Sequence, residues 1–151
     1  MLEWMHEPAV VEFMRADFAS KTLADCEAFI EASRQTEENL HLAVVNEEDA
    51  YLGTVSLKQI KNGRAEFGIT VRSCAQGTGA AHWGMEEILR LGLQERGLSE
   101  VYWCVDPANV RAVRFYDKYG YVRFVPEGEI LRDMVYTEKE ISRYTWYHVT
   151  A

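Results

Sequence analysis

The sequence has no apolar run approaching the roughly 20 residues that a membrane-spanning helix needs. Its opening, MLEWMHEP, also lacks the basic stretch followed by an apolar segment that marks a secretory signal. From these two absences we expect a soluble, cytoplasmic protein that does not enter a membrane.

Cysteine is scarce and scattered. Cys26, Cys74 and Cys104 are odd in number, form no CxxC pair and have no histidine nearby at the spacing of metal ligands. We therefore expect neither a disulfide framework nor a metal site.

Basic residues are outnumbered, with 16 Lys and Arg against 24 Asp and Glu, which leaves a net charge of −8. Nucleic-acid binding is driven by clustered Lys and Arg, so nucleic acid is not expected as a partner, and a cationic substrate suits this field better. The chain has 151 residues, nearly half of them hydrophobic, and no repeat or linker. This size predicts a single domain over residues 1–151.

Hydrophobic periodicity predicts alternating types of secondary structure along the chain. Helices are expected over 8–18 and 22–33, followed by a three-strand antiparallel meander over 41–45, 51–60 and 64–71. A helix then runs from the glycine-rich AQGTGAA to Arg96-Gly97, and its expected apolar face consists of Trp83, Ile88, Leu89 and Leu91. A buried strand over 101–105, a helix over 108–120 and closing strands over 121–124 and 142–149 complete the pattern, with an exposed loop over 125–141.

The turn Gln76-Gly77-Thr78-Gly79-Ala80-Ala81 lies between a strand and a helix. Its backbone amides and the helix N-terminus favour an anion such as a pyrophosphate. The Walker pattern would need Lys and then Ser or Thr where Ala80 and Ala81 stand, and a dinucleotide fold would place its glycine turn after the first strand. Nucleotide hydrolysis and hydride transfer are both disfavoured.

Two stretches resemble the signatures of the GNAT superfamily of N-acetyltransferases. GITVRSCAQGTGAA is similar to the family's acetyl-CoA signature, with Gln76, Gly79 and Ala81 at its key places. NVRAVRFYDKYGY is similar to its second signature, with Asn109, Ala112, Tyr116, Gly120 and Tyr121 in order. Further stretches, LGTVSLKQI, VYWCVDPANVRAV and EGEILRD, resemble the branch of ribosomal-protein N-terminal (alanine) acetyltransferases.

The resemblance implies an α/β (α+β) fold in which a mixed, mostly antiparallel sheet is flanked by helices. The cofactor would lie in a cleft between two splayed parallel strands, ITV and VYWCV. Family members usually begin with a strand that this chain lacks before its first helix, so that strand is either missing or replaced by a partner element.

The resemblance also implies a set of acetyl-CoA contacts. Backbone groups of Ile69 and Val71 would hold the pantetheine arm, and the amides of Gln76, Gly77, Thr78, Gly79, Ala80 and Ala81 would hold the pyrophosphate. Asn109 could cap the following helix, contact the pantetheine arm, or do both. Arg111 and Arg114 could reach the cofactor phosphates.

Acetyl transfer to an amine needs a base for the ammonium proton and an acid for the departing thiolate. Tyr116, in the second signature, is the candidate acid; Tyr119 and Tyr121 are its competitors. Glu66 is the candidate base, acting through water, and strand alternation places it on the same face as Gly68 and Thr70. Other groups that could lie near an acceptor are Glu3, Glu7 and His82.

The predicted activity is acetyl transfer from acetyl-CoA, with no metal, by direct attack of a primary amine in a ternary complex. The acceptor could be a protein N-terminus or a small molecule, and the protein a monomer or a homodimer. The alternative is a non-catalytic acyl-CoA-binding module. A pure interaction domain would leave both signatures unexplained.

Overall fold

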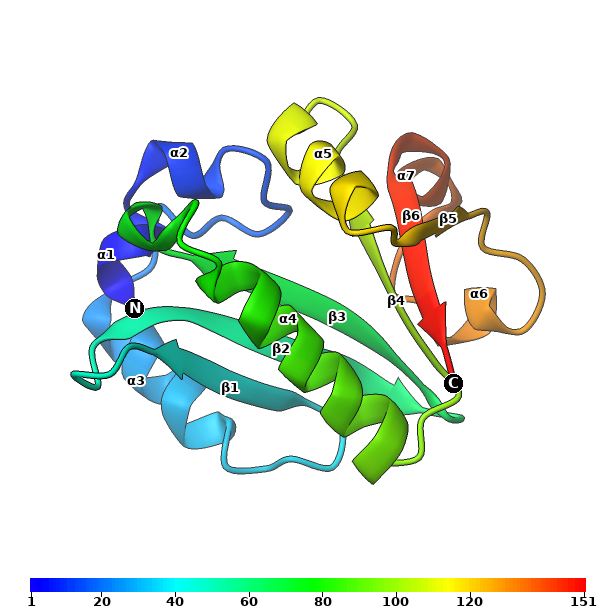
Figure 1. Ribbon diagram of the computed structural model, residues 1–151, viewed down its shortest axis with the longest axis horizontal. Coiled ribbons are helices and arrows are strands. Elements are labelled where there is room, and N and C mark those ends of the chain that lie inside the picture. Colours follow the sequence, from blue (N-terminus) through cyan, green and yellow to red (C-terminus); the bar gives the residue numbers. More distant parts are fainter.

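A computed structural model describes all 151 residues and is built on one six-stranded sheet (Figure 1). The strands are β1 (Leu40–Val45), β2 (Tyr51–Lys61), β3 (Arg64–Val71), β4 (Glu100–Val105), β5 (Val122–Phe124) and β6 (Thr145–Thr150). Their order across the sheet is β1-β2-β3-β4-β6-β5, and only β3 and β4 pair in parallel. The expected mixed, mostly antiparallel sheet is confirmed.

The meander of β1, β2 and β3 follows the predicted turns. Between β2 and β3 the chain reverses at Asn62 and Gly63, whose φ angles of 51° and 73° lie in the left-handed region that Asn and Gly tolerate best. Leu57 faces Phe67 across this hairpin, and both side chains are buried. Alternation then places Ser56, Lys58, Glu66 and Gly68 together on the opposite face.

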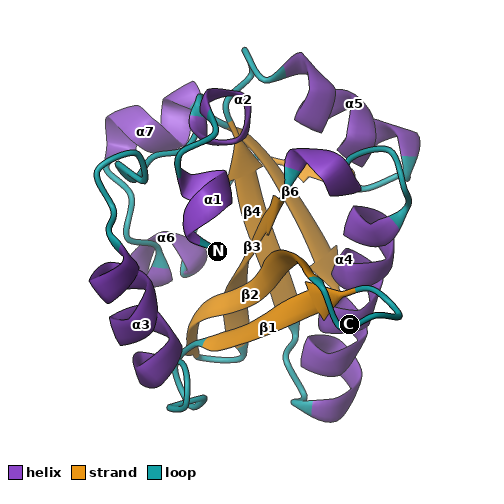
Figure 2. Ribbon diagram, turned by 90° about the vertical axis from the view of Figure 1, so that its left-hand side faces the viewer, coloured by secondary structure: helices purple, strands orange, loops and turns teal.

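Helices cover both faces of the sheet (Figure 2). One face carries α4 (Ala80–Arg90), which continues into a wider π turn over Leu91–Glu95, and α5 (Val110–Lys118). The other face carries α1 (Leu2–Met5), α3 (Leu23–Ala32), α6 (Ile130–Asp133) and α7 (Glu138–Arg143). None of these helices has the length and apolar character needed to cross a lipid bilayer.

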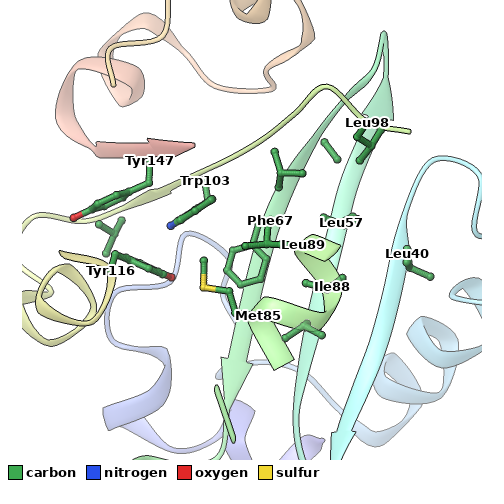
Figure 3. Packing of buried hydrophobic residues seen from close by; sticks show 14 of the residues in the cluster. Leu40, Leu57, Phe67, Met85, Ile88, Leu89, Leu98, Trp103, Tyr116 and Tyr147 are labelled. Atoms are coloured by element: carbon green, nitrogen blue, oxygen red, sulfur yellow. The ribbon is translucent and has the colours of Figure 1, made fainter. Parts of the chain in front are cut away.

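The main core lies between the sheet and the helices α4 and α5 (Figure 3). Met85 and Ile88 of α4 are fully buried against Leu57 and Phe67, as the helical spacing predicts. The expectation that Trp83 faces the core is wrong, because 59% of its surface is exposed. Helical spacing places it on the side of α4 opposite the buried Met85 and Ile88, so it faces solvent.

The predicted helix over 8–18 is also wrong in extent. Only α2 (Pro8–Val11) forms, started by the fixed φ of Pro8, and the unpredicted α1 precedes it. Beyond Val11 the chain turns back so that the Phe18 ring packs edge-on against Trp4, 5.1 Å between centroids. Burial of these two aromatic rings outweighs the helical periodicity of the segment.

The second predicted helix is confirmed as α3. The Thr22 hydroxyl accepts a hydrogen bond from the Asp25 amide, and the Asp25 carboxylate accepts one from the Thr22 amide, which forms a capping box. The same device begins α7, where Thr137 and Glu140 satisfy each other's amides. The segment 125–141, expected to be an exposed loop, therefore contains α6 and the start of α7, and β6 begins at Thr145 and not at Ser142.

Candidate active site

The strands β3 and β4 pair over a short stretch and then diverge (Figure 1). Their register joins Arg64 to Glu100, Ala65 to Val101 and Glu66 to Tyr102, and no pairing follows. The parallel neighbours expected from the sequence are thus confirmed, and Glu66 and Tyr102 form the last pair before the strands separate. We call the diverging part, Phe67–Val71 of β3 and Trp103–Val105 of β4, the fork.

Backbone groups of β3 point into the fork. The amide of Arg72 donates to the Leu52 carbonyl of β2 at 2.8 Å. Backbone N–H groups alternate between the two edges of a strand, so those of Ile69 and Val71 are directed away from β2 and toward β4. These are the two residues whose backbone the sequence assigns to a pantetheine arm.

The glycine turn that follows β3 leaves several amides free at the start of α4. Gly77 and Gly79 have φ angles of 78° and 86°, and a Cβ at either position would meet no atom within 4 Å. The amides of Gln76 and Thr78 donate to the carbonyls of Ser73 and Ala75 within the turn. Of the six amides expected to bind a pyrophosphate, these two have backbone partners and that of Ala80 donates to the Thr78 hydroxyl at 3.4 Å, whereas those of Gly77, Gly79 and Ala81 have no acceptor.

Helix α5 is fastened beside this turn. Asn109 is its N-cap, and the side-chain oxygen accepts from the Ala112 amide at 3.2 Å, so the capping role is confirmed. Arg111 donates a hydrogen bond to the side-chain oxygen of Gln76 and places a positive charge next to the turn. Arg114 is exposed on the same helix.

Tyr116 is the buried tyrosine of α5. Its ring packs 5.5 Å from Trp103 and 5.1 Å from Tyr147, centroid to centroid, and only 7% of the residue is exposed. Figure 3 shows its hydroxyl directed toward Phe67 and Met85, across the α4 side of the fork. Burial raises the pKa of this phenol above its ordinary value, so it stays protonated at neutral pH.

The two competing tyrosines lie elsewhere. Tyr119 is 39% exposed and stacks on the imidazole of His82 at 3.5 Å, so both residues have a packing role on the surface of α4 and α5. Tyr121 packs its ring edge-on against Trp103 at 5.2 Å. Both rings are therefore held by packing against other aromatic rings.

Glu66 is 5% exposed and lies at the closed end of the fork, on the face opposite α4. Its carboxylate accepts a hydrogen bond from the Tyr136 hydroxyl and lies 3.8 Å from the Lys58 ammonium. The hydroxyl of Tyr102 is buried and has no partner in the protein. A carboxylate, a cation and an unpaired hydroxyl thus meet where the strands part.

Sequence reasoning missed Tyr136, because it lies in the segment 125–141 that was expected to be a loop. The Cys104 thiol donates to the Tyr136 hydroxyl at 3.7 Å, and the Arg15 guanidinium lies 4.6 Å from the centre of the Tyr136 ring. Arg15 also pairs with Glu140 at 2.6 Å. The Thr137–Glu140 capping box was a readable sign of a helix here, but no motif pointed to Tyr136 itself.

Glu3 and Glu7 contact the residues that follow β3 and so hold the N-terminal segment against them. The Glu3 carboxylate pairs with Arg72, and that of Glu7 accepts from the Ser73 hydroxyl, each at 2.5 Å. Two cavities lie away from the fork. One, of about 300 Å³, lies beside α3 and is lined by Phe29 and His41, and the other, of about 360 Å³, lies by Arg64 at the turn between β2 and β3.

A family model described as an acetyltransferase (GNAT) domain matches residues 1–122. The chain belongs to the GNAT acetyltransferase family. It is therefore an acyltransferase, and acetyl-CoA is the acyl donor that this family uses. No curated protein sequence is similar enough to match it.

Solved structures share the fold across nearly the whole chain. A spermidine N-acetyltransferase from Vibrio cholerae, in complex with CoA and spermine, is 16% identical with a TM-score of 0.78, over 99% of this chain and 86% of that one. A domain from Methanocaldococcus jannaschii DSM 2661 is 15% identical with a TM-score of 0.68, over 99% and 89%. These identities establish the fold only, and the ribosomal-protein branch in particular finds no support among them.

The GNAT acetyltransferase fold observed here fits an acyl-CoA by its own geometry. The fork offers the unpaired β3 amides to an amide-bearing arm, and the glycine turn offers free amides and a helix N-terminus to a pyrophosphate. Two buried donors of β4, the Tyr102 hydroxyl and the Trp103 indole N–H, have no protein partner. Buried donors of this kind normally find an acceptor, and the protein supplies none for these two.

Proposed function

We propose that this chain, as one acetyltransferase domain over residues 1–151, acetylates a primary amine by direct attack in a ternary complex. The observation that carries the proposal is the arrangement around the fork. A buried carboxylate, Glu66, lies on one face of the sheet and a buried phenol, Tyr116, lies on the side of α4 and α5. A base and an acid on opposite sides of the same opening suit a reaction that removes a proton from one reactant and supplies one to another.

When bound, acetyl-CoA supplies an acyl group on a good leaving group. Backbone groups of Ile69 and Val71 would hold its pantetheine arm, and the amides of Gly77, Gly79 and Ala81 would hold its pyrophosphate beside Arg111. Gln76, Thr78 and Ala80 would shape the turn, and Asn109 would fix the start of α5 next to it. These contacts position the acyl group and need no side-chain chemistry.

Glu66 is proposed to take the ammonium proton of the acceptor, directly or through water. The hydrogen bond from Tyr136 restricts its carboxylate to one position at the closed end of the fork. Tyr116 is proposed to hold the proton that the departing thiolate receives. Its raised pKa keeps that proton in place until the thiolate forms.

For the acceptor we propose a cationic small molecule of the polyamine type. The net charge of −8 favours the approach of a polycation. The acceptor face carries the carboxylates of Glu66 and Glu140, which hold the protein's own cations Lys58 and Arg15, so a substrate ammonium group would bind there by displacing one of them. The Vibrio cholerae enzyme of the same fold binds spermine. A protein N-terminus is the second class of acceptor to be tested.

The experiment is a panel of amines assayed for release of CoA thiol from acetyl-CoA, with spermidine, an amino sugar, an amino acid and a short peptide with a free N-terminus. We expect the polyamine to have the highest kcat/KM. If the peptide has the highest kcat/KM instead, the acceptor is a protein N-terminus and not a polyamine. Tight binding of acetyl-CoA with no thiol release from any amine would favour the non-catalytic acyl-CoA-binding module.

A further inference from the structure

Lys58 presents a primary amine to the candidate base. It lies on β2 directly opposite Glu66, and its Nζ is 3.8 Å from the nearer carboxylate oxygen. The Glu66 side chain is 6% exposed, whereas that of Lys58 is 39% exposed. The ammonium group therefore lies where solvent meets the buried carboxylate, which is the position that an incoming acceptor amine must reach.

Gly68 gives the Lys58 side chain room to lie across β3. A Cβ at Gly68 would lie 3.2 Å from the Lys58 Cε and 3.3 Å from its Nζ, closer than ordinary van der Waals contact. The amine therefore crosses the strand at Gly68, the residue before Ile69, whose backbone amide points into the fork. A side chain at this position would push the amine away from the fork.

The charge of Lys58 also acts on Cys104, a residue of β4, the second strand of the fork. Burial raises the pKa of the Cys104 thiol to about 11, and the positive charge of Lys58 opposes that rise. Cys104 lies on β4, two residues beyond Tyr102, which is the last residue of β4 paired with β3. Contacts connect the same groups, because Glu66, 3.8 Å from the Lys58 ammonium, accepts from the Tyr136 hydroxyl, to which the Cys104 thiol of β4 donates.

We propose that Lys58 is an acetyl acceptor of the protein itself, so that the chain acetylates its own Lys58 Nζ when no better amine is present. This inference rests on the proposed function. Glu66 takes one proton from the Lys58 ammonium and passes it to water. The Nζ lone pair then forms a C–N bond to the thioester carbonyl carbon as the C–S bond breaks. The thiolate leaves with a proton from Tyr116, which regains one from the new amide nitrogen, and the products are Nε-acetyl-Lys58 and CoA thiol.

The test follows acetylation by mass spectrometry, which reads the modification and not the turnover of an added amine. Purified protein is incubated with acetyl-CoA and no other amine, and peptides are mapped over time. We expect one acetyl group per chain, on Lys58, with a rate constant that does not depend on protein concentration because the reaction is intramolecular. Glu66→Gln should slow this labelling at neutral pH.

Lys61→Arg is the matched control for Lys58→Arg. Lys61 is on the same strand and is similarly exposed, but it lies 4.0 Å from Asp133 and not beside the fork. The single acetyl group should persist in Lys61→Arg and disappear in Lys58→Arg. The surface lysines Lys21 and Lys139 report chemical acetylation, which does not need Glu66.

Four outcomes would overturn the inference. Lys58 could stay unmodified while the same preparation acetylates an amine of the panel, which would leave the proposed function standing. Lys58 could be labelled no faster than Lys21 and Lys139, which would mean chemical acetylation. A rate constant that rises with protein concentration would mean transfer between molecules. If neither Lys58 nor any amine is acetylated by protein that binds acetyl-CoA, the proposed function fails as well.

Discussion

At the scale of single residues, the site depends on a few side chains whose burial comes from their neighbours. Tyr116 keeps its proton because Trp103 and Tyr147 enclose its ring, and Glu66 stays ordered because Tyr136 donates to it. In both cases the partner comes from a distant part of the chain. The proposed acid and base could be named from a motif that resembles the family's and from the place of Glu66 on its strand, but their environment could not.

Tyr116→Phe should lower turnover while leaving the fold and acetyl-CoA affinity nearly unchanged. The substitution removes one hydroxyl and keeps the ring that packs against Trp103 and Tyr147. Loss of general-acid assistance costs about 10²-fold to 10⁴-fold in rate, and we expect the low end because a thiolate leaves fairly well unaided. The measurement is kcat under conditions where chemistry limits the rate, with calorimetry for acetyl-CoA affinity. Tyr121→Phe is the control, because Tyr121 is a half-buried tyrosine that also packs on Trp103. Equal rates for the two variants would remove Tyr116 from the mechanism.

Glu66→Gln should reduce activity most at neutral pH and regain part of it at high pH. A base that removes an ammonium proton becomes dispensable once the amine is already free in solution, so the ratio of wild-type to variant kcat/KM should fall as pH rises. A pH profile of both proteins from neutral to alkaline conditions measures this ratio. A loss of the same size at every pH would assign Glu66 a structural role only.

At the scale of elements, the sheet, its parallel pair and the two helices of the cofactor side were predictable, because regular periodicity and turn residues specify them locally. The N-terminal segment was not, because Trp4 and Phe18 form a contact that no local pattern encodes. The segment 125–141 was not, because its short helices are held by tertiary contacts such as Arg15 with Glu140. Tyr136, which touches both Glu66 and Cys104, belongs to that segment, so part of the site was missed with it.

The affinity for acetyl-CoA should depend on Gly79, the residue that precedes the first turn of α4. Gly79→Ala adds a methyl group where the phosphate approaches the backbone and places a residue with a side chain at a φ of 86°, a conformation that costs roughly 1–2 kcal/mol. Acetyl-CoA affinity measured by calorimetry should fall by at least tenfold, well beyond the change in stability. Gly97→Ala is the matched control, because Gly97 has a φ of 69° and open space around it but lies at the other end of the helical segment. Equal acetyl-CoA affinities in the two variants would mean that the phosphates do not bind at this turn.

At the scale of the whole molecule, the sheet consists of two three-stranded parts. The parts β1–β3 and β4–β6 are joined by the short parallel pairing that ends at Glu66 and Tyr102. A ligand in the fork would contact both parts and stabilise their arrangement. A ligand that binds only the folded state adds about 2.7 kcal/mol of stability at a concentration 100 times its Kd.

Acetyl-CoA should therefore slow hydrogen exchange at the fork more than elsewhere. The amides of Ile69 and Val71 point toward β4 without a partner there, so we expect them to exchange quickly in the free protein and slowly in the complex. Hydrogen–deuterium exchange resolved by residue measures this. Amides of the β1–β2 hairpin, which are paired within the sheet, are the internal reference. Protection spread evenly over both regions would argue against binding in the fork.

The strand order has a further consequence for synthesis of the chain. β6 lies between β4 and β5 in the sheet although it follows both in the sequence. A nascent chain can complete the β1–β3 meander early, but β4 has no antiparallel partner until Thr145–Thr150 leave the ribosome. Until then Tyr102 and Trp103, both buried in the finished protein, lie on a strand with one edge open. We therefore expect the newborn protein to be most exposed to aggregation and to chaperones between the emergence of Val105 from the ribosome and that of Thr150.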